Sequence, residues 1–379
     1  MTRVFFDNAA TTPIHPEVVQ VMTKSLSETF GNPSSSHSFG RDAKGQLEES
    51  RRTIAKLLGA KPSEIFFTSC GTESNNTILR NSIKSDQISE VWTTPIEHPS
   101  IYQTSNQIGE VIPVRFLELN PNGSVDIDKL EYELAKAAKK VLVSVMHANN
   151  EVGVLNDLKA ISEICHKHGA LLHSDMVQTM GHLPINFQEL KVDFASASAH
   201  KFHGPKGVGF MYIRQPNQIN SLITGGSQER GYRSGTENLA SIAGMAKAFE
   251  LATKNVDEDI IYLNKLRTTF MTKLKSSFPS INFLTKLDES LCTIVSTIFP
   301  PEFDSEMLLF QLDMKGVACS GGSACSSGAA KASHVLAHFK LPEACKVVRF
   351  SFSKFNTEQE IDFCIERIKE IANERGQNC

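Results

Sequence analysis

Between residues 64 and 213, short apolar segments alternate with longer amphipathic ones, and this alternation constrains the fold more than any other feature. The segment 141–147 is apolar throughout, as expected for a strand buried on both faces, whereas 158–169 has helical spacing and ends in glycine. Strands that alternate with helices require crossover connections, which favour a mostly parallel sheet covered on both faces. We therefore predict an α/β fold. The predicted strands are 64–69, 91–94, 141–147, 170–175, 193–199 and 208–213, and a further predicted helix spans 72–84.

The pattern changes after about residue 250. A long helical stretch at 246–278 precedes strand-like segments at 293–299 and 347–353 and a final amphipathic helix at 357–374. This order predicts a second, smaller α+β domain from about residue 255 to the end.

Composition narrows the classes of partner and compartment. The chain has 39 Lys and Arg against 42 Asp and Glu, so its net charge of −3 gives no electrostatic reason to expect nucleic acid or an anionic membrane. No apolar run reaches the ~20 residues of a transmembrane helix, and the first residues lack the pattern of a targeting signal. The eight cysteines form neither a CxxC pair nor a dense framework. We expect a cytoplasmic protein without direct nucleic-acid or membrane binding.

Two residues at strand ends suggest a pyridoxal phosphate (PLP) site. Lys201 follows the strand-like segment 193–199, and a partly buried lysine there has the lowered pKa that suits a Schiff base. Asp175 ends the segment 170–175, where a carboxylate can pair with a protonated pyridine nitrogen. Each residue also has an ordinary interpretation, as a surface lysine at a strand end and as a capping aspartate.

The turn at 69–73, Ser-Cys-Gly-Thr-Glu, lies between a predicted strand and a predicted helix. Free N–H groups at a helix N-terminus beside glycine and hydroxyls suit a phosphate, although a plain capping turn has the same composition. Ser198 and His200 offer further donors just before Lys201. A Schiff-base lysine, a pyridinium partner and a phosphate cup together meet the requirements of PLP.

Cys325 stands in the stretch 318–333, whose residues are almost all small. Such a backbone is flexible, so a thiol there can reach both an active site and a partner protein. The alternative is a surface cysteine in a Gly/Ser linker. Cys319 is either a second reactive thiol or, more simply, a buried strand cysteine. The closely spaced histidines at 166–168 and 200–203 have no matching second cluster, so we expect no metal site.

These residues resemble the NifS/IscS-type cysteine desulfurases, PLP enzymes of the class-V aminotransferase family. The similarity runs through eight ordered motifs: FGNPSSSHSFGR (30–41), FTSCGTESNN (67–76), TPIEHPS (94–100), MHANNEVG (146–153), HSDMVQ (173–178), SASAHKFHGPKGVG (196–209), GGSQERGYRSGTEN (225–238) and SGGSACSSG (320–328). The resemblance implies PLP fold type I, with a seven-stranded sheet. We place the large PLP-binding domain at 14–254, and the small domain at 1–13 and 255–379 with a catalytic loop at about 319–333.

The resemblance also implies a role for each matching position. Lys201 forms the Schiff base with PLP, and Asp175 pairs with the pyridine nitrogen. The other implied cofactor contacts are Gln178 and Asn150 at the ring hydroxyl, Gly71, Thr72, Ser198 and His200 at the phosphate, and Thr236 at the phosphate of the neighbouring subunit.

For the reaction, the resemblance implies that His98 stacks on the ring and moves protons, while Arg349 and Asn32 bind the substrate carboxylate. Cys325 accepts the sulfur of L-cysteine as a persulfide and alanine is released. The implied assembly is a homodimer that passes sulfur to an acceptor protein, such as an iron–sulfur scaffold or a thiolation protein. The alternatives are a selenocysteine lyase, another class-V aminotransferase or lyase, and a non-enzymatic sulfur-relay or regulatory protein that kept the fold and binds no PLP.

Overall fold

A seven-stranded sheet forms the larger part of the structure, with the strand order β2-β8-β7-β6-β5-β3-β4. This computed structural model describes residues 2–85, 88–215, 217–303, 307–321, 333–341 and 345–376. The central strands pair in parallel, whereas β8 runs antiparallel to both β2 and β7. The predicted mostly parallel sheet is therefore confirmed. Its strands are β2 Ile65–Thr68, β3 Glu90–Thr93, β4 Val114–Phe116, β5 Val141–Ser144, β6 Leu171–Asp175, β7 Phe194–Ser198 and β8 Gly209–Ile213.

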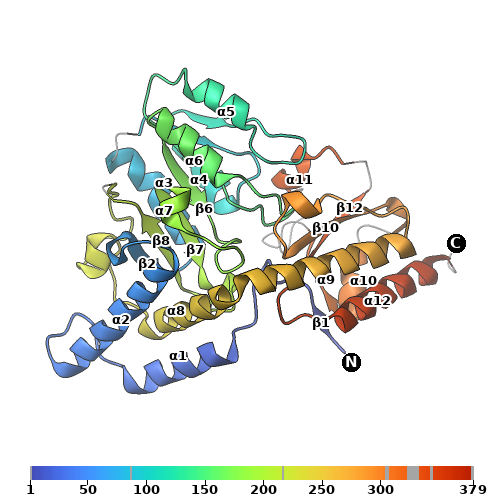
Figure 1. Cartoon of the computed structure of the whole chain (residues 1–379), viewed down its shortest axis with the longest axis horizontal. Helices are drawn as coiled ribbons and strands as arrows, with labels where there is room; N and C mark the ends of the chain where they lie inside the picture. Colours follow the sequence, from blue (N-terminus) through green and yellow to red (C-terminus); the bar gives the residue numbers. More distant parts are fainter. Residues whose placement is uncertain are drawn as a thin grey trace.

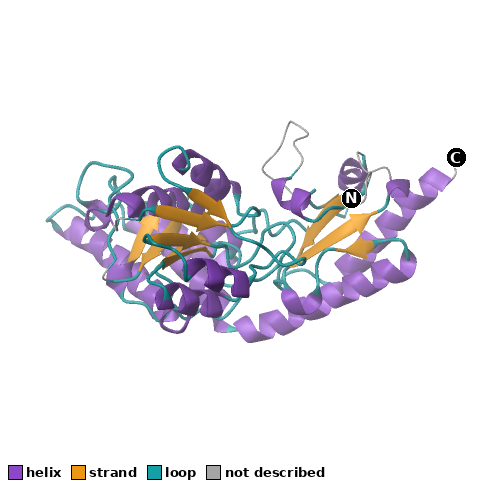
Figure 2. Ribbon diagram, turned by 90° about the horizontal axis from the view of Figure 1, so that it is seen from above, coloured by secondary structure: helices purple, strands orange, loops and turns teal. Residues whose placement is uncertain are grey.

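Helices cover both faces of this sheet (Figure 2). Phe67 and Val143 pack into the core beneath α2, α6 and α8, while their neighbours Phe66 and Leu142 pack into a second core with α3 and α4. Because successive side chains of a strand point to opposite faces, burial on both faces produces the continuous apolar runs seen in the sequence. The helices of this part are α1 Pro16–Glu28, α2 Ser38–Leu57, α3 Gly71–Ser85, α4 Pro99–Ile108, α5 Ile127–Leu134, α6 Leu158–Lys167, α7 Phe187–Leu190 and α8 Leu239–Lys254.

A smaller sheet has its own core beside the large one (Figure 1). Its strands follow the antiparallel order β12-β10-β9, and α9, α10 and α12 contribute apolar side chains to the same core. A separate parallel pair joins β1 to β11. These elements are β1 Val4–Phe5, α9 Val256–Ser277, β9 Asn282–Phe283, β10 Ile294–Phe299, α10 Leu308–Met314, β11 Val317–Ala318, α11 His334–His338, β12 Lys346–Ser351 and α12 Glu358–Gly376.

The helical stretch predicted at 246–278 is interrupted. It comprises the end of α8 and all of α9, which meet at Asn255, where φ is −128° and ψ is 33°. Asparagine hydrogen-bonds readily to nearby backbone groups in non-helical conformations, which makes it a common point of interruption. The helix that packs on the large sheet therefore ends where the helix of the smaller core begins.

The first residues of the chain run between the two cores. β1 pairs with β11, and the Phe6 carbonyl accepts a hydrogen bond of 2.7 Å from the Ser351 amide on β12. The following residues then pass to the edge of the large sheet, where the Thr12 amide donates to the His200 carbonyl at 2.9 Å. The structure shows that the large and the small sheet have separate hydrophobic cores. The domain boundary at residue 254 and the assignment of residues 1–13 to the smaller domain stay predictions.

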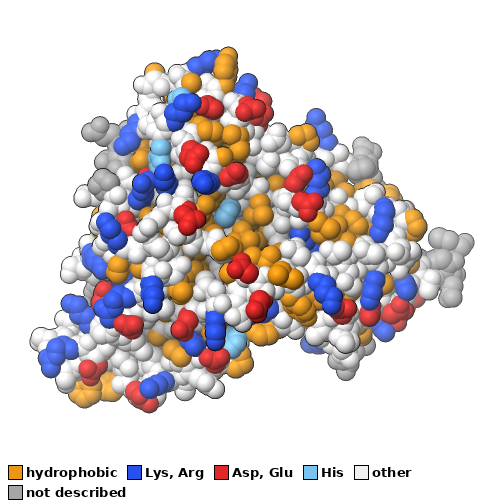
Figure 3. All heavy atoms as spheres, in the orientation of Figure 1, with side chains coloured by type: hydrophobic (Ala, Val, Ile, Leu, Met, Phe, Trp, Pro, Cys, Tyr) orange, Lys and Arg blue, Asp and Glu red, His pale blue; other side chains and the backbone are white. Residues whose placement is uncertain are grey.

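No helix in the described part of the chain is long and apolar enough to cross a membrane. On the face of the molecule in Figure 3, basic and acidic side chains are interspersed. This face therefore offers no broad surface of one sign to a polyanion.

Candidate functional site

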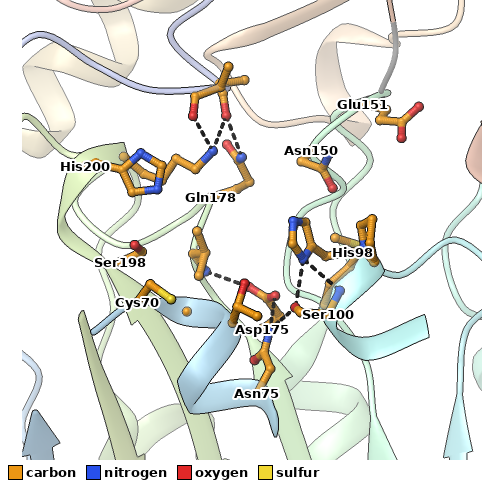
Figure 4. A pocket seen from close by; sticks show the side chains of 18 of the residues that line it. Cys70, Asn75, His98, Ser100, Asn150, Glu151, Asp175, Gln178, Ser198 and His200 are labelled. Carbon is orange, nitrogen blue, oxygen red and sulfur yellow. Dashed lines mark hydrogen bonds between the residues drawn. The ribbon is translucent and has the colours of Figure 1, made fainter. Parts of the chain in front are cut away.

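A cavity of about 330 Å³ lies at the carboxyl ends of β3, β5, β6 and β7, which is where open α/β sheets bind ligands (Figure 4). The N-terminal segment and β12 of the smaller sheet complete its wall. The predicted site residues that line this cavity are Gly71, Thr72, His98, Asn150, Asp175, Gln178, Ser198, His200, Lys201 and Arg349.

Lys201 ends a short 3₁₀ helix directly after β7. Its Nζ donates hydrogen bonds to the carbonyl oxygens of Ala9 and Ala10, at 2.6 and 2.9 Å. Its own carbonyl accepts a hydrogen bond of 2.9 Å from Nε2 of His182. The amine is thus held at the wall of the cavity by the N-terminal segment rather than projecting into solvent.

Asp175 is 6% exposed at the end of β6, and both of its carboxylate oxygens accept hydrogen bonds. Oδ1 accepts from the Val177 amide at 3.0 Å, and Oδ2 accepts from Nδ2 of Asn75 at 2.7 Å. Hydrogen-bond donors therefore reach both oxygens of this carboxylate. A buried anion therefore faces the cavity.

The predicted phosphate turn opens α3. A Cβ on Gly71 would lie 2.6 Å from Cγ2 of Val177, so only glycine allows α3 to pack this closely at the cavity. The first N–H groups of a helix lack partners within the helix and bind anions. Across the cavity, the hydroxyl of Ser198 is buried without a hydrogen-bond partner among the described residues. The first N–H groups of α3 and the Ser198 hydroxyl are therefore available as hydrogen-bond donors to an anion in the cavity.

His98 caps the N-terminus of α4. Its Nδ1 lies 2.7 Å from the hydroxyl of Ser100 and accepts from the Ser100 amide at 3.1 Å. Burial lowers the pKa of His98, more than the charge of Asp175 raises it, and the charge of Lys201 lowers it further. Burial also lowers the pKa of His200 to about 4. Both imidazoles are therefore neutral at neutral pH.

Glu97, next to His98, is fully buried. Its Oε1 accepts hydrogen bonds from the Met146 amide at 2.9 Å and from the Thr94 hydroxyl at 2.8 Å. Burial raises the pKa of Glu97 to about 8 despite these hydrogen bonds, and the charge of Asp175 raises it further. This carboxyl carries a proton at neutral pH and joins the loop after β3 to the end of β5.

Arg349 reaches the cavity from β12 and is 1% exposed. It donates to the Asn150 carbonyl at 2.6 Å and to the Asp7 carboxylate at 2.8 Å, while its Nε has no partner among the described residues. The buried amide oxygen Oδ1 of Asn150 is likewise without a partner there. Gln178 is fixed by its own hydrogen bond, 3.0 Å long, from Nε2 to the Ala9 carbonyl.

Of the predicted site residues that the structure describes, two do not line this cavity. Asn32 is exposed on the loop between α1 and α2, where its Oδ1 accepts from the Ser34 amide at 2.9 Å. Thr236 is exposed on the segment before α8. Neither reaches the cavity of its own chain, and their predicted roles stay predictions.

The segment before Thr236 is anchored by a buried ion pair. Glu229 accepts two hydrogen bonds of 2.8 Å from the Arg51 guanidinium and a third, also 2.8 Å, from the Phe67 amide on β2. Both charged side chains are only 2% exposed. Glu229 and Arg230 have φ values of 45° and 57°, which side chains other than glycine rarely adopt. The ion pair therefore holds a strained turn against the large sheet.

Of the cysteines singled out above, Cys325 lies outside the described residues. Cys319 directly follows β11 and packs against the smaller core, and burial raises the pKa of its thiol well above the usual range. A raised pKa disfavours the reactive thiolate, which favours the structural interpretation of Cys319. Cys70 lines the cavity, and its Sγ lies 3.7 Å from the Ser69 hydroxyl.

Sequence reasoning missed Asn75, Ser100 and Glu97, which connect and support the predicted residues. From the sequence alone, a polar residue inside a predicted helix or next to a histidine is expected at the solvent-exposed surface. The available signal was spacing, since Asn75 follows Gly71 by one helical turn and so returns to the same face.

The chain is similar to known proteins over almost its whole length. The family model "Aminotransferase class-V" matches residues 4–363. A cysteine desulfurase IscS from Dictyoglomus turgidum is 39% identical over 373 residues, covering 97% of this chain and 94% of that protein. A solved NifS-like protein has a TM-score of 0.91 and 37% identity, covering 98% of this chain and 100% of that one. SspA, solved in complex with cysteine, has a TM-score of 0.81 and 28% identity over 94% of this chain and 100% of its own.

Proposed function

Because this chain belongs to the class-V aminotransferase family as a cysteine desulfurase, we propose that its cavity binds PLP and L-cysteine and that Cys325 takes up the sulfur. The observation that carries the proposal is the meeting, in one cavity, of Lys201, the buried Asp175 carboxylate and the unpartnered Ser198 hydroxyl.

The residues present fit PLP. Ser198 and the first turn of α3 offer donors for the phosphate, and Asp175 offers a buried anion for a protonated ring nitrogen. Lys201 would hold the cofactor covalently, with Asn150 and Gln178 beside the ring. When bound, PLP supplies an electron sink for negative charge that develops at the substrate α-carbon.

The chain's own groups then orient the substrate and move its protons. The guanidinium of Arg349 anchors the substrate carboxylate, for which its unpartnered Nε offers a donor. The amine of Lys201 takes the proton from the α-carbon, a transfer favoured by proximity. His98, neutral and at the cavity wall, exchanges a proton with the reacting groups.

The sulfur transfer is redox-balanced without an external oxidant. The Cys325 thiolate attacks the sulfur of L-cysteine, an S–S bond forms and the substrate C–S bond breaks with its electron pair left on carbon. Protonation of that carbon chain gives alanine, and the persulfide remains on Cys325. A sulfur-acceptor protein would then receive the outer sulfur.

The proposed enzyme is a homodimer. Thr236 and Asn32 are exposed and do not line the cavity of their own chain, which suits residues that serve a second copy. The buried ion pair of Arg51 and Glu229 fixes the segment that presents Thr236. We expect Thr236 to reach the phosphate of the neighbouring subunit.

A single-turnover reaction with L-cysteine tests the proposal. The holoenzyme should release alanine and gain the mass of one sulfur atom on the peptide that contains Cys325. Cys325→Ala should lose both products, while the matched variant Cys319→Ala should retain both. Unchanged alanine release from Cys325→Ala would contradict the role of that thiol. Turnover of selenocysteine but not of cysteine by the wild type would replace the proposal with a selenocysteine lyase.

A further inference from the structure

A continuous chain of hydrogen bonds joins Asp175 to His98 through two side chains that have no assigned role (Figure 4). Nδ2 of Asn75 on α3 donates to Oδ2 of Asp175 at 2.7 Å and to the hydroxyl of Ser100 on α4 at 2.9 Å. The Ser100 hydroxyl lies 2.7 Å from Nδ1 of His98, and the Ser100 amide donates to the same nitrogen at 3.1 Å.

The chemistry of these groups fixes the direction of every hydrogen bond. An ionised carboxylate only accepts, so the Asn75 atom that faces Asp175 is its NH₂ group. The same NH₂ group faces Ser100, whose oxygen must therefore accept, which leaves the hydroxyl hydrogen for His98. Nδ1 of His98 then accepts from both the hydroxyl and the amide of Ser100 and cannot carry a proton itself.

The surroundings keep this direction in place. Asn75 is 1% exposed, and its Oδ1 has no hydrogen-bond partner among the described residues. A buried amide with an unsatisfied oxygen stabilises the fold poorly, which points to a role for its NH₂ group. Burial is the largest influence on the pKa of His98 and lowers it; the charge of Asp175 raises this pKa, and the charges of Lys201 and His334 lower it.

We propose that Asn75 and Ser100 are positioning residues that keep His98 neutral with its single ring proton on Nε2. Nδ1 is occupied by Ser100, and no described residue hydrogen-bonds to Nε2. His98 therefore exchanges its proton only through Nε2. Asp175 sets the direction of the hydrogen bonds through Asn75 and Ser100, whereas burial keeps the ring neutral.

The consequence for catalysis rests on the proposed function, because it needs a reacting group at Nε2. The protonation state of the ring does not. A protein that fails to release alanine could still show the predicted tautomer, and an active desulfurase could show the other one. A measurement on the ring itself thus separates failure of this proposal from failure of the proposed function.

Magic-angle-spinning NMR of the holoenzyme with ¹⁵N-labelled histidine provides that measurement. Protonated and unprotonated ring nitrogens resonate far apart, and a His98→Gln difference spectrum assigns one ring among the 12 histidines. We expect a protonated Nε2 and an unprotonated Nδ1 at neutral pH. A proton on Nδ1, or a doubly protonated ring, would overturn the proposal.

Ser100→Ala removes the hydroxyl donor and leaves the amide donor. Loss of one hydrogen bond to the neutral form should raise the ratio of protonated to neutral His98 by about 5-fold at a given pH. Ser100→Thr should restore the wild-type titration. The control is Ser105→Ala on the same helix, since Ser105 is also buried but its hydroxyl has no partner among the described residues. Equal His98 titrations in Ser100→Ala and Ser105→Ala would refute the role of Ser100.

Asn75→Ala provides a second variant that does not alter α4. The Ser100 hydroxyl would lose its donor and could turn away from His98, so the same ratio should rise. Asn75→Ala with a His98 titration identical to wild type would refute the link to Asp175, even if Ser100→Ala fails to fold.

Discussion

Glu229→Gln should destabilise the large sheet strongly, although it changes only one buried oxygen to an amide nitrogen. The Arg51 guanidinium would keep its hydrogen bond to the Ile65 carbonyl, 2.7 Å long, and its contact with Glu48 at 3.1 Å. The Arg51 guanidinium would lose its buried anionic partner, since the side chains of Arg51 and Glu229 are both only 2% exposed. Removing one partner of a buried ion pair costs about 3–5 kcal/mol.

The structure places this variant near the lower limit of that range. Glutamine retains one acceptor for the Phe67 amide, so the strand N–H need not be left unpaired. We expect a loss of about 3 kcal/mol in the free energy of unfolding. Glu48→Gln is the matched control, because Glu48 pairs with the same arginine but is 31% exposed, and an exposed pair contributes about 1 kcal/mol or less.

Urea unfolding followed by tryptophan fluorescence measures both variants. The only tryptophan, Trp92, lies on β3 in the same core as the large sheet, so it reports unfolding of that sheet. The two variants should be compared with the wild type in the same cofactor state, since bound ligand adds to stability. A Glu229→Gln protein no less stable than Glu48→Gln would refute the reasoning that this buried pair holds the turn before Thr236.

Three further predictions follow from the site. Arg349→Lys loses the guanidinium fork, so KM for L-cysteine should rise about 10- to 100-fold with a smaller change in kcat, and an unchanged KM would contradict carboxylate binding there. Glu97 has a folded-state pKa raised by burial from 4.5 to about 8, so its contribution to stability is complete below the unfolded pKa and is lost as pH rises through 8. The wild type should therefore lose free energy of unfolding relative to Glu97→Gln as pH rises from 5 to 8, by at most about 1.4 kcal/mol per pH unit. Urea unfolding measures this difference, and a difference that does not change with pH would exclude the titration of Glu97. Thr236→Ala should weaken cofactor retention about 5-fold in equilibrium dialysis, and unchanged retention would exclude its contact with the phosphate.

The large sheet and the central site residues could be predicted because they follow from periodicity. Apolar runs identify the strands, and parallel strands bring their carboxyl ends together, so Asp175 and Ser198 had to share one edge. The break at Asn255 was missed because the flanking residues on both sides favour a helix.

The supporting residues depended on packing that spacing does not encode. Asn75 and Ser100 lie on different helices, and only the contact between α3 and α4 brings their side chains together. Glu97 is a charged residue type whose complete burial contradicts its usual place at the surface. Asn32 and Thr236 show the opposite case, in which the sequence motif is clear but one chain alone does not bring the residue to a cavity.

The pairing of β1 with β11 has a consequence for biosynthesis. The ribosome makes Val4 long before its strand partner Val317, so β1 can take its place in the fold only after β11 has been made. The large sheet can form earlier, since its strands lie between residues 65 and 213. The guanidinium of Arg349, which comes from β12 of the small sheet, cannot join the cavity wall until that strand has been made. A nascent chain that stops before β12 thus lacks part of the cavity wall, and the complete cavity marks a chain that has been translated past Arg349.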